Sequence, residues 1–274
     1  MIEKLVGKCD QKQLALYSDV TYSQAIHWFG CCLKPMKMSI ILPKNRINET
    51  SRRPLLVWLC GGGFSIMDKD VWIPELMYFA QHGYTVASVE YRTNNDGFYP
   101  APVVDIKAAI RYLRAHAEEY FIDPDKVVLG GESAGGCLSL LAAASDGISA
   151  FEQGDYLDQP SNVQAVLDFY GTAYLDYEHD IYPGGPEIDT GNPNIKAGDI
   201  STMLNEKFPP TFILHGDKDP FVPLADSYKL HDRLEELGVT CEMLVFEGAA
   251  HGTNEFYHTE TLDRVLDFLN RVMP

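Results

Sequence analysis

The sequence predicts an α/β fold in which a mostly parallel, eight-stranded sheet carries helices on both faces. From residue 55 onward, short apolar runs rich in Val, Ile and Leu alternate with segments of helical periodicity, the pattern of successive strand–helix–strand units. One of these runs ends in a glycine-rich turn that leads directly into a helix, at residues 127–144. The length of 274 residues suits one such domain, so residues 1–274 are expected to form a single domain.

Five of the expected strands precede residue 135. Two lie before the alternation begins, at about 16–22 and 36–42, where apolar and polar residues alternate imperfectly. Strands at 55–59 and 84–91 flank a helix at 74–81, which ends near Gly83, a natural helix stop. A helix at 101–120 then leads to the fifth strand, which starts at residue 127. The apolar face of that helix repeats at helical spacing and comprises Val103, Ile106, Ile110, Leu113 and Ala117.

The remaining strands are expected at 163–170, 212–214 and 241–246, with helices at 224–237 and 259–272. The segment 171–208 interrupts this rhythm, because it is rich in Tyr, Asp, Gly and Pro and has no clear periodicity. A segment of this length inside a compact domain is uncommon unless it is functional. We therefore expect an insertion over the active site at about 171–208; a surface loop without a function is the alternative.

The turn at 131–135 has the pattern Gly-x-Ser-x-Gly, with Ser133 at its centre. Strand, tight turn and helix around this pattern are typical of the nucleophile elbow of α/β-hydrolases, so this fold is expected. A serine exposed on a strained turn needs neighbours without side chains, which Gly131 and Gly135 provide. The helix that follows directs the N–H groups of its N-terminus toward the reaction centre.

Two further side chains would complete a catalytic triad with Ser133. In α/β-hydrolases the chain order is Ser, then Asp or Glu, then His, at the carboxyl ends of strands. Asp219 and His251 satisfy this order after the strands at 212–214 and 241–246. Asp217 lies in the same loop as Asp219 and remains an alternative. We favour Asp219 because the Pro-Phe-Val-Pro sequence that follows it would fix the loop. The histidine takes the serine proton, and the acid holds the imidazole.

Ester hydrolysis also needs hydrogen-bond donors for the oxyanion that develops on the substrate. Three glycines at 61–63 follow the strand at 55–59, and their backbone N–H groups can approach a substrate closely because glycine has no side chain. Ala134, the residue after the nucleophile, supplies another N–H.

Composition and charge narrow the choice of partners. The net charge of −17 argues against nucleic acid or a membrane surface, because both are polyanions. No apolar run approaches the ~20 residues needed to cross a bilayer, and the N-terminus lacks a signal-peptide pattern. The six cysteines form no C-x-x-C pair, and reduced thiols in a cytoplasmic protein are expected. No sequence motif indicates a metal or cofactor, and the oligomeric state is left open.

Together these motifs resemble those of the hormone-sensitive-lipase-like carboxylesterases. The resemblance runs from about residue 36 to the C-terminus and is weak in 171–200. The stretch at 164–171, Gln-Ala-Val-Leu-Asp-Phe-Tyr-Gly, looks like the subgroup of feruloyl and acetyl-xylan esterase-like enzymes. The other motifs that carry the resemblance are residues 60–64, Tyr91-Arg92, residues 100–102, Asp105, and residues 131–136, 215–223 and 248–252.

This resemblance implies an α/β-hydrolase fold and hydrolysis of carboxylic esters without a cofactor. By motif, Ser133 would be the nucleophile, Asp219 the acid and His251 the base. The oxyanion hole would be formed by Gly62, Gly63 and Ala134.

One position departs from the family pattern. The family usually has His where this chain has Cys60, before the three glycines. That His helps to fix the oxyanion loop and is not a triad member, so the change bears on the stiffness of the loop. Cys60 has neither an elbow nor a positioned base, and we do not expect it to be the nucleophile.

The leading functional prediction is a cytoplasmic serine esterase acting on small-molecule esters with short acyl groups, with acetyl groups on imported oligosaccharides as one candidate substrate. Tyrosines in 171–182 could stack on the sugar rings, although aromatic surface contacts serve many ligands. One alternative is an amidase or peptidase that uses the same triad; a prolyl-oligopeptidase relative is disfavoured because no propeller-sized extension is present. The other is a non-catalytic binding protein on the same fold, which would usually lack a triad member.

Overall fold

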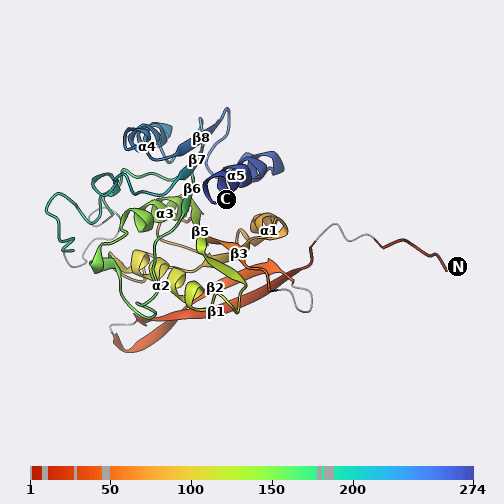
Figure 1. Ribbon diagram of the computed structural model, residues 1–274. Coiled ribbons are helices and arrows are strands. Elements are labelled where there is room, and N and C mark those ends of the chain that lie inside the picture. Colours follow the sequence, from red (N-terminus) through yellow and green to blue (C-terminus); the bar gives the residue numbers. More distant parts are fainter. Residues whose placement is uncertain (1, 8–11, 28–29, 45–49, 178–180, 182–187) are drawn as a thin grey trace.

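The computed structural model describes residues 2–7, 12–27, 30–44, 50–177, 181 and 188–274. Within these ranges, eight strands form one sheet in the order β1-β2-β4-β3-β5-β6-β7-β8, and helices cover both of its faces (Figure 1). The parallel part comprises β3 (Arg53–Leu59), β4 (Thr85–Val89), β5 (Ile122–Glu132), β6 (Ala165–Phe169), β7 (Thr211–Gly216) and β8 (Cys241–Phe246). The predicted mostly parallel α/β sheet is therefore confirmed.

The first two strands form a long antiparallel hairpin at one edge of the sheet. They are β1 (Leu14–His27) and β2 (Cys32–Pro43), and β2 pairs antiparallel with β4. Both extend beyond the predicted 16–22 and 36–42. The additional residues are a mixture of exposed, half-buried and buried positions, and cross-strand backbone pairing continues through them. Pairing between backbone groups does not require apolar alternation, so the sequence underestimated both lengths.

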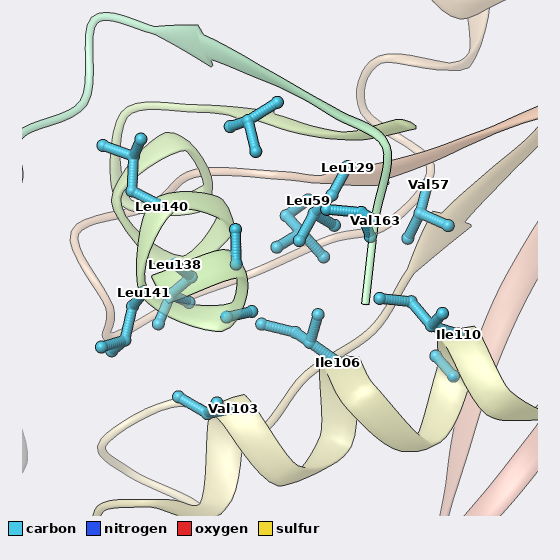
Figure 2. Close-up of a cluster of buried hydrophobic side chains, with 14 of the residues drawn as sticks. Val57, Leu59, Val103, Ile106, Ile110, Leu129, Leu138, Leu140, Leu141 and Val163 are labelled. Carbon is cyan, nitrogen blue, oxygen red and sulfur yellow. The ribbon is translucent and has the colours of Figure 1, made fainter. Parts of the chain in front are cut away.

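The two faces of the sheet are covered by different helices. On one face, α1 (Ile73–Gln81) and α5 (Thr259–Val272) share a core cluster with Leu56, Trp58 and Val128. On the other, α2 (Ala101–Ala115), α3 (Ala134–Ala144) and α4 (Leu224–Glu236) pack on alternate residues of the same strands. Figure 2 shows part of this second cluster, where α2 and α3 face β3 and β5. Its labelled residues include Val57, Leu59, Val103, Ile106, Leu129 and Leu138.

Three further boundaries differ from the sequence expectation by more than two residues. Strand β5 begins at Ile122 instead of 127. Helix α2 ends at Ala115 instead of 120, although Ala117 and Tyr120 remain buried, because the chain turns there to enter β5 and Ile122 donates its N–H to Ala117. Helix α3 begins at Ala134, four residues before the apolar run at 138–144. Its first turn contains two glycines, which periodicity does not detect. By contrast, β8 and α5 have the predicted bounds.

The described parts of 171–208 carry a single short 3₁₀ turn, η4 (Ile200–Thr202), and pack beside the loop that follows β3. The Tyr177 ring contacts the Phe64 ring edge-on at 5.7 Å, and Tyr99 donates its hydroxyl to the Ala197 carbonyl. Tyr182, one of the tyrosines in 171–182 considered for sugar stacking, lies outside the described residues. Among the helices that the structure describes, none combines the length and apolar character required to cross a membrane.

Candidate active site

Ser133 occupies the turn between β5 and α3 in a left-handed backbone conformation, with φ 54° and ψ −122°. Such a conformation is costly for a residue with a side chain, and close packing around the turn maintains it here. A Cβ added at Gly131 would lie 2.6 Å from the Leu59 carbonyl oxygen, and one added at Gly135 would lie 2.0 Å from the same atom. Only glycine therefore allows the turn to approach β3 this closely, as the elbow motif requires.

The structure brings the three expected triad residues together from three loops at the carboxyl ends of β5, β7 and β8. His251 Nε2 lies 2.7 Å from Ser133 Oγ, and His251 Nδ1 lies 2.6 Å from Asp219 Oδ2. The two distances place the imidazole between the hydroxyl and the carboxylate, in hydrogen-bond contact with both. The tautomer with hydrogen on Nδ1 suits this arrangement, because Nε2 is then free to accept the serine proton.

The Asp219 carboxylate is completely buried, and both of its oxygens have hydrogen-bond partners. Its Oδ1 accepts the backbone N–H groups of Phe221 and Val222 at 2.8 and 2.9 Å. Burial raises the pKa of Asp219, but these hydrogen bonds and the adjacent His251 outweigh it and hold the pKa below its ordinary value. Asp219 is thus kept ionised beside His251.

Asp217, the alternative acid, has different hydrogen-bond partners from Asp219. Its Oδ1 accepts the backbone N–H of Gly248 at 2.6 Å, and its Oδ2 lies 3.3 Å from Lys218 Nζ. The Gly248 hydrogen bond lowers the pKa of Asp217. Asp217 therefore ties the loop after β7 to the loop after β8, whereas Asp219 contacts His251.

The glycine loop after β3 is held by Glu132, the residue before the nucleophile. The nearly buried Glu132 carboxylate accepts the backbone N–H of Gly61 and, at 3.0 Å, the indole N–H of Trp72. Gly62 and Gly63 have φ values of 129° and 59°, and a Cβ at Gly62 would meet the Ile66 carbonyl oxygen at 2.1 Å. Sequence reasoning missed Glu132, although a carboxylate inside the elbow motif was a visible signal.

Cys60 is nearly buried beneath this loop, with its Sγ 3.8 Å from Glu132 Oε1. Burial, reinforced by the Glu132 charge, raises the pKa of the Cys60 thiol to about 12. A thiol in this state is a poor nucleophile at neutral pH. The environment fits the expectation that Cys60 is a packing residue.

An aromatic group connects the glycine loop to His251. The Trp72 ring stacks on Tyr257 at 4.4 Å, the Tyr257 and Tyr170 hydroxyls lie 3.1 Å apart, and the Tyr170 ring meets the His251 ring at 4.7 Å. Tyr170 is fully buried and has a positive φ of 46°. Nothing in local sequence marked these rings as neighbours, because they come from three separate elements.

The expected sugar-stacking role of the tyrosines is not supported where the structure describes them. Tyr177 is fully buried and packs on Phe64, so its faces are closed to a ligand. Lys229 Nζ lies 5.3 Å from the centre of the half-buried Tyr174 ring. Among the described residues, one side-chain group has metal-ligand spacing, His231, Asp232 and Glu235 on α4, and it includes no expected site residue.

Comparison with known proteins places this chain in a family. The BD-FAE family model matches residues 38–234. Esterase LipQ of Mycobacterium tuberculosis is 31% identical over 198 residues, which cover 68% of this chain and 47% of that protein. An acetyl esterase of Salmonella schwarzengrund is 24% identical over 255 residues, 86% of this chain and 75% of that protein. The chain spans about half the length of the first curated relatives it matches.

Solved structures give the same result for the fold. The butyrate-bound esterase 2 of Thermogutta terrifontis has a TM-score of 0.73 at 27% identity, covering 88% of this chain and 90% of that chain. The same esterase phosphorylated by paraoxon has a TM-score of 0.76 at 25% identity, covering 93% and 94%. These neighbours confirm the α/β-hydrolase fold and the carboxylesterase resemblance. The family model spans well over half of the length of this chain, and the chain therefore belongs to the BD-FAE family.

Proposed function

We propose that this protein is a serine carboxylesterase that hydrolyses short-chain acyl esters of small molecules through a covalent acyl-enzyme. The observation that carries the proposal is the continuous contact from Ser133 Oγ through the His251 ring to Asp219 Oδ2, at 2.7 and 2.6 Å. In this arrangement the imidazole can accept the proton of the serine hydroxyl, and the ionised carboxylate can stabilise the resulting imidazolium.

In the acylation step, Ser133 Oγ attacks the ester carbonyl carbon while its proton passes to His251 Nε2. The carbonyl oxygen becomes an oxyanion, for which the backbone N–H groups of Gly62, Gly63 and Ala134 are the proposed donors. Gly61 is not in this set, because its N–H is donated to Glu132. His251 then gives the proton to the alcohol oxygen as the ester C–O bond breaks, and Asp219 stabilises the imidazolium that exists between the two transfers.

Deacylation repeats these steps with water as the nucleophile. His251 accepts a proton from water as the water oxygen attacks the acyl carbon. It then returns the proton to Ser133 Oγ, which releases the carboxylic acid and restores the enzyme.

The acyl group is proposed from the relatives. One is named an acetyl esterase, and the Thermogutta esterase was solved with butyrate and with propionate. We propose the same size range here. The described part of 171–208 contacts Phe64 in the glycine loop, and we propose that this segment is an insertion within a single domain that borders the substrate. Acylated oligosaccharides are a less favoured subset of substrates, because Tyr177 is buried.

The test combines a substrate series with covalent labelling. Initial rates on p-nitrophenyl esters from acetate to decanoate, and on acetylated xylo-oligosaccharides, would define the acyl and alcohol preference. We expect the highest kcat/KM between acetate and butyrate. A fluorophosphonate probe should add one label to Ser133, located by peptide mass spectrometry.

Ser133→Ala should abolish both activity and labelling, with a loss of several orders of magnitude in kcat. Ser139→Ala is the matched control, because Ser139 lies in α3, the helix that follows Ser133, is fully buried and donates to the Gly135 carbonyl. It should retain both. A label on another residue, or more than about a tenth of the activity in folded Ser133→Ala, contradicts the triad. Faster cleavage of anilides than of matched esters would favour an amidase, and no turnover of either would favour a binding protein.

A further inference from the structure

A second histidine, His215, contacts the same carboxylate oxygen of Asp219 that His251 contacts. His215 Nε2 lies 3.3 Å from Asp219 Oδ2 and 3.1 Å from the carbonyl oxygen of Val222. Its other ring nitrogen, Nδ1, lies 2.7 Å from the hydroxyl of Ser227 in α4. His215 is completely buried and Ser227 is almost so. One buried ring therefore joins β7, the loop that carries Asp219 and the first turns of α4.

The contacts define the hydrogen positions on this ring. Both neighbours of Nε2 are acceptors, so Nε2 carries the hydrogen and donates it. Burial lowers the pKa of His215, although Val222 and the Asp219 charge oppose this shift, and the ring is neutral. Nδ1 is then an acceptor, and the Ser227 hydroxyl donates to it. The titratable groups that face His215 are Asp219 and His251, and a positive charge on His251 further disfavours protonation of His215.

We propose that His215 is a positioning residue for the catalytic acid, and that Ser227 fixes its tautomer. Asp219 Oδ1 is held by two backbone N–H groups, and Oδ2 is contacted by His251 Nδ1 at 2.6 Å and by the polar Nε2–H of His215 at 3.3 Å. The shorter contact of His215 is with Val222, so the ring also anchors the loop whose N–H groups hold Oδ1. Contacts at both oxygens therefore restrict rotation of the Asp219 carboxylate about its Cβ–Cγ bond. This inference rests on the proposed triad and extends it from Ser133 to α4.

Three substitutions at His215 separate its hydrogen bonds from its volume. His215→Gln places an amide N–H close to the Nε2 position and can still donate to Val222 and Asp219. His215→Asn carries its amide near the Nδ1 position, beside Ser227, and cannot reach them. His215→Leu removes both nitrogens. We expect kcat on p-nitrophenyl acetate to fall about 10- to 100-fold in His215→Leu and His215→Asn, with KM nearly unchanged, because the acid is misplaced by a fraction of an ångström. His215→Gln should retain most of kcat.

Two further measurements distinguish positioning from a general loss of structure. Loss of the polar Nε2–H of His215 leaves more negative charge on Asp219 Oδ2, which stabilises the protonated form of His251. The pH midpoint, at which kcat/KM reaches half of its plateau value, should therefore move upward in His215→Leu. Ser227→Ala leaves His215 in place but frees its tautomer, and kcat should fall only about 3-fold. Thr211→Val is the matched control, because Thr211 is fully buried at the opposite end of β7 and its hydroxyl donates to the nearby Pro209 carbonyl. It should lower the melting temperature without moving the pH midpoint.

The outcomes separate this inference from the proposed function. If Ser133→Ala and Asp219→Asn are inactive while His215→Leu keeps more than half of wild-type kcat with an unmoved pH midpoint, His215 is structural and the inference is wrong. If His215→Leu does not fold, the comparison of His215→Gln with His215→Asn decides, and equal kcat values overturn the inference. If folded Ser133→Ala stays active, the proposed function itself is wrong.

Discussion

The indole N–H of Trp72 donates to the Glu132 carboxylate at 3.0 Å, although the two residues are 60 positions apart in the chain. The same carboxylate oxygen accepts the backbone N–H of Gly61. Glu132 also directly precedes Ser133, so one side chain links the nucleophile to the glycine loop that is proposed to bind the oxyanion. The separation between nucleophile and oxyanion donors is therefore set by the Glu132 side chain and by Trp72, which holds it.

Glu132 should accordingly be sensitive to substitution. Glu132→Ala is expected to lower kcat by about 10²-fold, the loss typical of an oxyanion donor that is removed or displaced. Glu132→Gln keeps an acceptor for Gly61 and should lose much less. Trp72→Phe removes the indole N–H that holds Glu132 while keeping an aromatic ring on Tyr257, and it should lower kcat less than Glu132→Ala because Gly61 still donates to the carboxylate. Steady-state kinetics on p-nitrophenyl acetate measure all three, and a loss below about threefold in Glu132→Ala would show that the loop is held in another way.

The two aspartates of the β7 loop should differ strongly. Asp219→Asn replaces the ionised partner of His251 by a neutral amide, which stabilises the imidazolium poorly and favours the wrong tautomer, with a loss of up to ~10⁴ in kcat. Asp217→Asn retains the oxygen that accepts from Gly248 and should keep kcat within about tenfold. The comparison uses kcat of both variants at a temperature where both are folded. A larger loss in Asp217→Asn would reverse the assignment of the acid.

Cys60→Ser should keep substantial activity, because the oxyanion donors are backbone N–H groups that the substitution leaves in place. A hydroxyl with no partner in this setting would cost roughly 1–3 kcal/mol in the free energy of unfolding. The Sγ atom lies 3.8 Å from Glu132 Oε1, which is too far for an O–H···O hydrogen bond, so we expect a cost within that range. Chemical denaturation gives the stability, and kcat at low temperature gives the activity. A hundredfold loss in kcat, or an acyl adduct mapped to Cys60 in the wild type, would show a catalytic thiol.

The buried carboxyl of Asp168 predicts how the free energy of unfolding changes with pH. It is completely buried beside the elbow, its Oδ1 accepts the N–H of Gly171 at 2.9 Å, and its Oδ2 has no hydrogen-bond partner among the described residues. Burial raises its pKa from 3.8 to about 7. Between these two values the folded protein holds a proton that the unfolded chain has released, so the free energy of unfolding decreases as pH rises. At 1.36 kcal/mol per pKa unit, the decrease is at most on the order of 4 kcal/mol.

Asp168→Asn removes this dependence while keeping the acceptor for Gly171. We expect the variant to melt at a higher temperature than the wild type at pH 8 and at a similar temperature at pH 5. Thermal unfolding followed by circular dichroism at both pH values makes the comparison. Equal melting temperatures at pH 8 would mean that Asp168 ionises in the folded state without a penalty.

Much of this protein is encoded in local sequence. The parallel sheet follows from apolar runs that alternate with helical segments. The bounds of β8 and α5 were predicted to the residue, since β8 is a short, largely apolar run and α5 has apolar residues at helical spacing on one face. The order of Ser133, Asp219 and His251, each after a strand, was also readable, because all parallel strands end at one edge of the sheet. The glycines of the elbow were visible because their backbone requirement is local.

The tertiary structure decided what depends on contacts between distant segments. The length of the β1–β2 hairpin is set by cross-strand pairing, which polar residues sustain as well as apolar ones. Tyr177 was expected to face a ligand, but packing against Phe64 buries it. The link from Glu132 to Trp72, and the contact of His215 with Asp219, Val222 and Ser227, join different loops and helices. Periodicity and motif spacing report on neighbours along the chain, whereas these hydrogen bonds arise only when the sheet has placed the ends of its strands side by side.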